Sequence, residues 1–107
     1  MRYSIRFAET AKDDLREIAY SIIDRSKEPE IAKSFVTELR EVCNRLADFP
    51  NQGALPKDYI LRSMGYRYLT HDGYLVFYLT DEKTKIVVIM AIFNEKRDYI
   101  RIMRKYI

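Results

Sequence analysis

The chain has 107 residues, of which 48 % are hydrophobic and 33 % charged, and its formal net charge is +3. This length and composition exclude intrinsic disorder and predict one domain, residues 1–107, with a modest hydrophobic core. The longest apolar run, residues 86–93, is far shorter than the roughly 18–20 residues that span a bilayer, so no membrane segment is expected.

The N-terminal residues predict a strand followed by a helix. Residues 3–7 alternate between apolar and polar side chains, as a half-buried strand does. This segment has no apolar run of the signal-peptide kind, so we expect a cytoplasmic protein. Thr10 and Asp13 resemble a capping box, and the helix that they open carries apolar residues at helical spacing as far as Ile23.

A second helix is predicted after the break at residues 26–29, with Pro29 in its first turn. Its apolar stripe comprises Ile31, Phe35, Leu39, Val42, Cys43, Leu46 and Phe49. Residues 9–49 therefore form an αα-hairpin with one shared face to bury. Cys43 is the only cysteine and lies on this stripe, which indicates a small buried thiol in a reducing compartment.

The second half of the chain predicts a loop, three strands and a short helix. Residues 50–65 contain two prolines and two glycines and show little periodicity, which favours a surface loop. Strands are expected at residues 67–70, 74–79 and 85–93, and the last is apolar on both faces, as a central strand is. The tail from Glu95 has helical spacing, and we expect it to be weakly held. The predicted class is α+β, with element order β-α-α-β-β-β-α.

Positive charge gathers towards the C-terminus. Residues 1–50 hold 9 basic and 10 acidic side chains, whereas residues 51–107 hold 10 and 6. The last twelve residues carry five basic side chains against Asp98 alone. Such a cluster attracts polyanions, although basic residues at a helix end also complement the helix dipole. Charge alone leaves both interpretations open.

Three segments in this order resemble the RelE/ParE superfamily of type II toxin–antitoxin toxins. They read Tyr-Arg-Tyr-Leu at residues 66–69, Tyr-Leu-Val-Phe-Tyr at 74–78 and Ile-Phe-Asn-Glu-Lys-Arg-Asp-Tyr at 92–99. The resemblance covers nearly the whole chain. It implies a cytoplasmic toxin neutralised by a cognate small acidic antitoxin. Because the C-terminal face is basic and carries apolar tail residues, we expect this antitoxin to cover Arg97 or to displace the tail from Tyr99 onward.

The resemblance implies two targets. RelE-like members are described as metal-free endonucleases that cut mRNA on the ribosome, which requires a base, an acid and cations around the scissile phosphate. On this hypothesis Arg67, Arg97 and Tyr99 are the catalytic candidates. Phosphate binding would fall to Arg67, Lys96, Arg97 and Arg101, because guanidinium groups suit bidentate phosphate contacts. ParE-like members share the scaffold but poison DNA gyrase.

Two positions depart from the nuclease pattern. Tyr74 stands where RelE-like nucleases carry an arginine, and Leu69 stands where some carry a second lysine. Loss of two cations weakens the nuclease hypothesis and is compatible with ParE-like members. We nevertheless expect a toxin that inhibits translation by ribosome-dependent mRNA cleavage. The alternatives are a gyrase poison without nuclease activity and a degenerate toxin that only binds antitoxin or regulates transcription.

His71, the only histidine, lies in a predicted hairpin turn, where polar residues are expected for backbone reasons. A role in proton transfer is the competing hypothesis. One histidine and one cysteine do not make a metal-ligand constellation, so neither a metal site nor a cofactor is expected. Tyr66 and Tyr68 are candidates for stacking on a nucleobase, whereas Phe77 is expected to pack against the helical hairpin.

Overall fold

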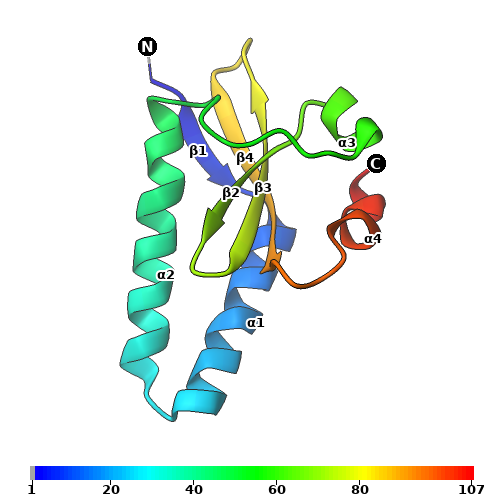
Figure 1. Cartoon of the computed structure of the whole chain (residues 1–107). Helices are drawn as coiled ribbons and strands as arrows, with labels where there is room; N and C mark the ends of the chain where they lie inside the picture. The colour runs from blue at the N-terminus through cyan, green and yellow to red at the C-terminus, as the bar shows by residue number, and fades with distance from the viewer. Residues whose placement is uncertain (1) are drawn as a thin grey trace.

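The computed structural model describes residues 2–107 and has the predicted α+β order, with one additional short helix. Figure 1 shows the hairpin of the two long helices beside a single sheet, with the two short helices on its other side. The elements are β1 (Ser4–Phe7), α1 (Glu9–Ser26), α2 (Pro29–Asn44), a 3-10 turn (Arg45–Ala47), α3 (Tyr59–Ser63), β2 (Arg67–His71), β3 (Tyr74–Asp81), β4 (Ile86–Asn94), α4 (Tyr99–Met103) and a final 3-10 turn (Arg104–Tyr106).

The sheet has the strand order β1-β4-β3-β2. β1 runs parallel to β4, from Ser4 opposite Ile86 to Phe7 opposite Ile89, and the other pairs are antiparallel. The prediction that the last strand is central is confirmed, and its apolar run reflects burial on both faces. The β2–β3 turn consists of Asp72 and Gly73, which both have positive φ, as a two-residue hairpin turn requires.

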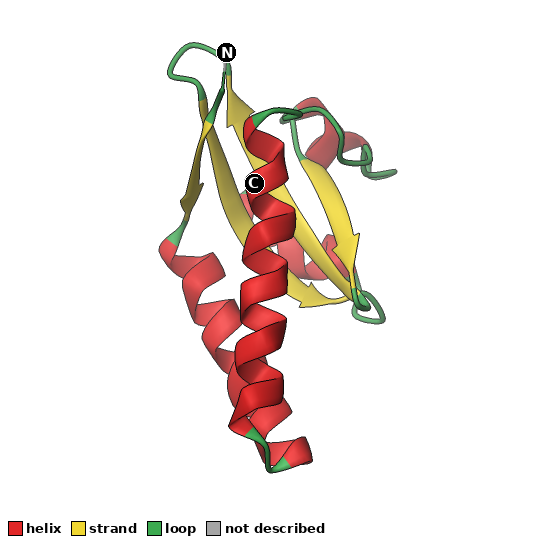
Figure 2. Cartoon of the chain, turned by 90° about the vertical axis from the view of Figure 1, so that its left-hand side faces the viewer, coloured by secondary structure: helices red, strands yellow, loops and turns green. Residues whose placement is uncertain are grey.

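The two faces of the sheet carry separate cores. α1 and α2 cover one face, and Figure 2 shows the hairpin in front of the sheet and extending beyond its end. Leu15, Leu39 and Cys43 pack there against Val76 and Tyr78, among others. The opposite face is covered by α3 and the C-terminal tail, and its core comprises Leu61, Tyr66, Phe77, Ala91, Phe93 and Met103.

Several local predictions are wrong, and among them Ile31 and Phe49 of the predicted apolar stripe are exposed. α1 begins at Glu9 with Ala8 as its N-cap, so Thr10 does not open a capping box. Instead the Thr10 hydroxyl donates to the Met90 carbonyl at 2.8 Å. Phe77 is fully buried, but it belongs to the core on the far side from the helical hairpin.

The predicted loop at residues 50–65 contains a helix. α3 spans five residues, and its N-cap Asp58 accepts a hydrogen bond from the Leu61 amide at 3.0 Å. A helix this short is not stable alone, and burial of Leu61 holds it against the sheet. Ala54 also forms a bridge to Tyr68 at the open edge of β2.

The thiol of Cys43 is fully buried between the hairpin and the sheet, as the apolar stripe predicts. Loss of hydration in this position raises the pKa of Cys43 to about 12, so the thiol stays protonated and unreactive at neutral pH. Over residues 2–107, none of the helices combines the length and the apolar character needed to cross a membrane.

Candidate functional site

The basic motif after β4 forms a tight turn that leads into α4. The Asn94 side chain accepts a hydrogen bond from the Lys96 amide at 2.9 Å, and the Arg97 amide donates to the Asn94 carbonyl at 3.1 Å. Asp98 then caps α4 by accepting from the amides of Ile100 and Arg101. The turn leaves the side chains of Lys96 and Arg97 exposed.

The tail is anchored to the sheet more firmly than expected. The ring of Tyr99 stacks on Phe77, with 5.7 Å between the centroids and an interplanar angle of 16°. The Tyr99 hydroxyl accepts a hydrogen bond from the Asp58 amide at 3.1 Å, which joins α4 to the start of α3. Met103 is fully buried, and the Tyr66 hydroxyl donates to the Tyr106 carbonyl at 3.3 Å.

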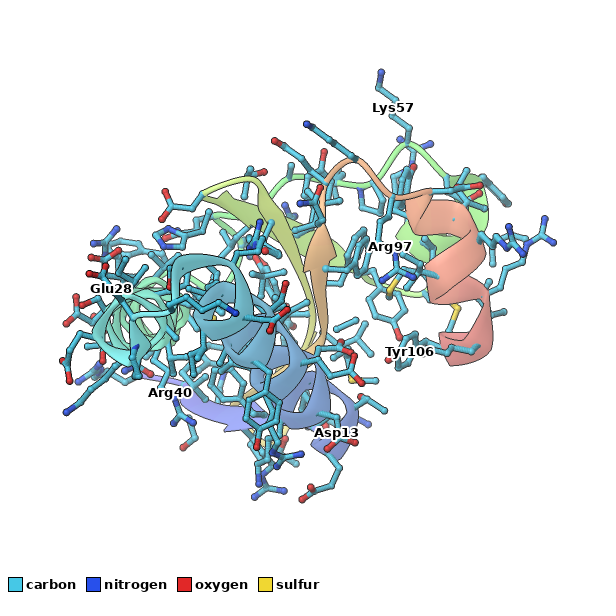
Figure 3. The ribbon with its side chains drawn as sticks, turned by 90° about the horizontal axis from the view of Figure 1, so that it is seen from below. Asp13, Glu28, Arg40, Lys57, Arg97 and Tyr106 are labelled. Atoms are coloured by element: carbon cyan, nitrogen blue, oxygen red, sulfur yellow. The ribbon has the colours of Figure 1, made fainter. Side chains whose placement is uncertain are left out.

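A groove of about 690 Å³ lies between α1 and this tail. Three cations line it from the tail side, namely Arg97, Arg101 and Lys105. Asp14 and Glu17 of α1 face them. Phe93, Ile102 and Tyr106 supply apolar surface, and Asp98 completes the lining. Figure 3 shows Arg97 and Tyr106 on the side of α4 that faces β4, whereas Lys57 projects away from the molecule.

The position of Asp14 follows from the unequal lengths of two strands. β1 pairs with β4 only as far as Ile89, which leaves the next residues of β4 without a strand partner on that side. Side chains of α1 take this place: Thr10 donates to the Met90 carbonyl, and Asp14 accepts from the Ile92 amide at 3.0 Å. Partial burial raises the pKa of Asp14, and this effect exceeds the opposing influence of the Ile92 amide and Lys105.

Asp14→Asn is therefore expected to stabilise the protein at pH 7. The side-chain oxygen of asparagine can still accept the hydrogen bond from the Ile92 backbone N–H, and the variant avoids the cost of a partly desolvated negative charge. The pKa of Asp14 is raised above its ordinary value of 3.8 in the folded state. The protonated carboxyl therefore favours folding at low pH, and this contribution to the free energy of unfolding is lost as the pH rises and the carboxyl ionises. The gain in Tm should vanish below about pH 3.

Thermal unfolding of wild type, Asp14→Asn and Asp14→Ala at both pH values tests this expectation. The alanine variant removes the acceptor and should be less stable than the asparagine variant, because an unsatisfied buried amide costs about 1–3 kcal/mol. If asparagine and alanine are equally destabilising at pH 7, the proposed balance at Asp14 is wrong.

Arg67 lies away from the groove. In β2 it alternates onto the same face as Leu69, which packs in the core beneath the helical hairpin. Its Nη1 donates to the Gly53 carbonyl at 2.9 Å. The Gly53 amide donates in turn to the buried Tyr78 hydroxyl at 3.0 Å. Arg67 and Tyr78 thus hold the segment after α2 against the sheet.

The structure consequently brings only some of the candidate residues together. Arg97 and Arg101 share the groove with Lys105. Lys96 is exposed in the preceding turn, and Tyr99 packs on the sheet face opposite to Arg67. The groove residues that sequence reasoning missed are Asp14 and Glu17. Both read as ordinary polar positions of an amphipathic helix, so the sequence pattern carries no signal for them.

The remaining aromatic candidates pack in the interior. Tyr66 is 1 % exposed, so the expectation that it stacks on a nucleobase does not fit this structure. Tyr68 is half-buried beside Phe77, with 5.3 Å between the ring centroids. Tyr74 packs edge-to-face on Phe35 of α2 at 5.2 Å.

His71 ends β2, and Phe35 is also its neighbour, at a centroid distance of 6.0 Å. Among residues 2–107, one group of side chains has the spacing of metal ligands, namely Glu38, His71 and Asp72.

Residues 5–99 match the family model described as ParE toxin of type II toxin-antitoxin system, parDE. The chain belongs to this ParE toxin family. The match runs from β1 to the first residue of α4 and so includes Arg67, Arg97 and Tyr99. The predicted membership of the RelE/ParE superfamily is confirmed.

Solved structures share the fold of this ParE-family toxin. The chromosomal ParDE system from Pseudomonas aeruginosa aligns with a TM-score of 0.71 at 23 % identity, covering 87 % of this chain and 96 % of that chain. The RelBE2 toxin–antitoxin complex from Mycobacterium tuberculosis aligns with a TM-score of 0.61 at 22 % identity, covering 88 % of this chain and 99 % of that chain. The isolated Escherichia coli RelE toxin aligns with a TM-score of 0.54 at 14 % identity, covering 98 % of this chain and 99 % of that chain. Comparison with curated proteins gave no match.

Proposed function

We propose that this ParE-family toxin acts by binding its target, DNA gyrase, and not by cutting RNA. The observation that carries this proposal is the separation of the catalytic candidates. Arg67 lies on the face of the sheet beneath the hairpin, and Tyr99 lies on the opposite face. Metal-free RNA cleavage needs an acid, a base and cations around one phosphate, within hydrogen-bond reach of the reacting atoms.

The hydrogen bonds of the two side chains support the same proposal. The guanidinium of Arg67 is engaged with the Gly53 carbonyl, and the hydroxyl of Tyr99 accepts from the Asp58 amide. Both interactions hold loop segments to the sheet, which gives the two residues a structural role. The two positions that depart from the nuclease pattern support the same proposal. Leu69 is buried in the core beneath the hairpin, and Tyr74 packs on Phe35, so neither side chain supplies a cation.

The groove beside the tail suits the acidic antitoxin that the family membership implies. Arg97, Arg101 and Lys105 face Asp14 and Glu17 across it, so an acidic segment would compete with these two carboxylates for the tail cations. The exposed apolar side chains of Ile100 and Ile107 offer further contact area. We propose that such a segment binds in this groove, covers Arg97 and loosens the tail from α1.

Purified toxin added to DNA gyrase and supercoiled plasmid tests the target. We expect gyrase-linked broken DNA to accumulate with toxin concentration. A parallel reaction with translating ribosomes and a defined mRNA should leave the message intact. The reverse result, with gyrase unaffected and the message cut within codons, would replace gyrase poisoning with ribosome-dependent cleavage.

Variants in the same assays test the residues. Arg97→Ala removes a cation from the groove, and Lys57→Ala is its matched control, because Lys57 is an exposed cation that points away from the molecule. If the message is cut, and cutting is lost in Arg97→Ala but not in Lys57→Ala, the nuclease hypothesis and its site would both be correct.

A further inference from the structure

Glu38 of α2 and the adjacent His71 and Asp72 of the β2–β3 hairpin bring one imidazole and two carboxylates together. One ligand atom of each lies within 4.8 Å of the others. We propose that these three side chains bind a divalent metal ion, zinc, which joins α2 to the β2–β3 turn. Zinc accepts imidazole nitrogen and carboxylate oxygen, and three protein ligands leave its fourth tetrahedral position to water. The site is independent of the proposed function.

The distance between the His71 imidazole and the Asp72 carboxylate fits two ligands of one metal ion better than it fits a direct hydrogen bond. Nε2 of His71 lies 3.5 Å from Oδ2 of Asp72. That separation exceeds the roughly 2.7–3.2 Å of a good hydrogen bond. Two ligand atoms about 2.0–2.1 Å from a tetrahedral zinc lie roughly 3.4 Å apart.

The imidazole also needs a partner. Nε2 of His71 is buried, and no hydrogen-bond partner for it occurs among the described residues. A buried polar atom left in this state costs free energy, so its position requires an explanation. A metal ion bound at Nε2 supplies one, because it uses the nitrogen lone pair and leaves the ring proton on Nδ1.

The fold holds the three ligands in place. The Asp72–Gly73 turn, with φ of 47° and 81°, sets the direction of the Asp72 side chain. Phe35 packs against the His71 ring and limits its rotation. Glu38 lies three residues after Phe35 in α2, and so projects from the same side of that helix. The carboxylates of Glu38 and Asp72 border a groove of about 650 Å³ through which an ion can enter.

The test uses the untagged full chain, so that His71 is the only histidine present. Equilibrium dialysis against zinc alone should show one ion per chain. The ¹⁵N resonances of the single imidazole should respond at Nε2, and Tm should rise with zinc concentration because the ion binds the folded state.

Three variants and one control assign the ligands. Glu38→Gln and Asp72→Asn change exposed side chains and should preserve the fold. Each should weaken zinc binding at least tenfold, because even groups that only orient a metal ligand contribute that much. His71→Ala should abolish it. Glu41→Gln changes an exposed acid on the same helix outside the cluster and should bind zinc as wild type does.

The proposal is overturned if wild type binds no zinc, or if the ligand variants bind it as tightly as Glu41→Gln. An Nε2 resonance that does not respond to zinc would overturn it as well.

Discussion

Replacing Phe77 with alanine is expected to destabilise the protein by about 3–5 kcal/mol, which is a large share of the stability of a small domain. Phe77 is fully buried at the centre of the second core. It stacks on Phe93 at 5.6 Å and on Tyr99 at 5.7 Å, and it contacts Tyr66 and Tyr68 through further ring pairs. Removal of the ring leaves a cavity under the tail and removes the surface on which Tyr99 rests.

Chemical denaturation of Phe77→Ala beside Phe49→Ala measures the effect. Phe49 is 65 % exposed, so its loss should change stability by no more than about 0.5 kcal/mol. Trypsin should also cut the basic tail of Phe77→Ala faster than that of wild type, because the tail loses its anchor. Equal stabilities for the two variants would mean that the second core does not hold the domain together.

Gly53→Ala is expected to destabilise the protein by about 3 kcal/mol and to lower Tm by roughly 10 °C or more. A methyl group on Gly53 would lie 2.5 Å from the Tyr78 hydroxyl and 2.9 Å from the Tyr68 carbonyl. Tyr78 is fully buried, and its hydroxyl accepts from the Gly53 amide and donates to the Pro50 carbonyl. Its displacement would therefore cost packing and two hydrogen bonds.

Gly65→Ala provides the control for this substitution. Gly65 has a φ of 95°, but its nearest neighbour, a methyl group of Leu79, is 3.9 Å from an added Cβ. Its replacement should cost only the backbone strain of a left-handed residue, about 1–2 kcal/mol. A Tm for Gly53→Ala equal to or above that of Gly65→Ala would contradict the close contact at Tyr78.

The features of the fold that could be predicted are those with a strong local pattern. The apolar run at residues 86–93 identifies a central strand, and the alternation of Tyr74 and Val76 with Leu75 and Phe77 divides β3 correctly between two cores. Which of the two faces the helical hairpin covers depends on long-range packing, so strand alternation alone does not place Phe77 on the side opposite the hairpin. α3 has no pattern of its own, because one turn of helix is stabilised by its tertiary contacts.

The candidate site was harder to predict because its residues depend on distant partners. Strand alternation predicts that Arg67 lies on the same face of the sheet as Leu69. Its hydrogen bond to the Gly53 carbonyl depends on the path of the loop before α3, which the sequence does not reveal. Asp14 reaches β4 only because β1 is the shorter strand. The sequence offers His71 only Cys43 as a second typical metal ligand, whereas the fold brings its imidazole to the carboxylates of Asp72 and Glu38.

Induction of the chain in bacterial cells, with mRNA ends mapped and the DNA damage response recorded in the same culture, tests most directly whether this toxin acts without RNA chemistry. We predict intact messages together with DNA breaks that disappear when gyrase is made resistant. Arg67→Ala and Arg97→Ala should both leave the messages intact. Cleavage within translated codons that is lost in these two variants would contradict the proposal, and would mean that Arg67 and Arg97 come together on the ribosome.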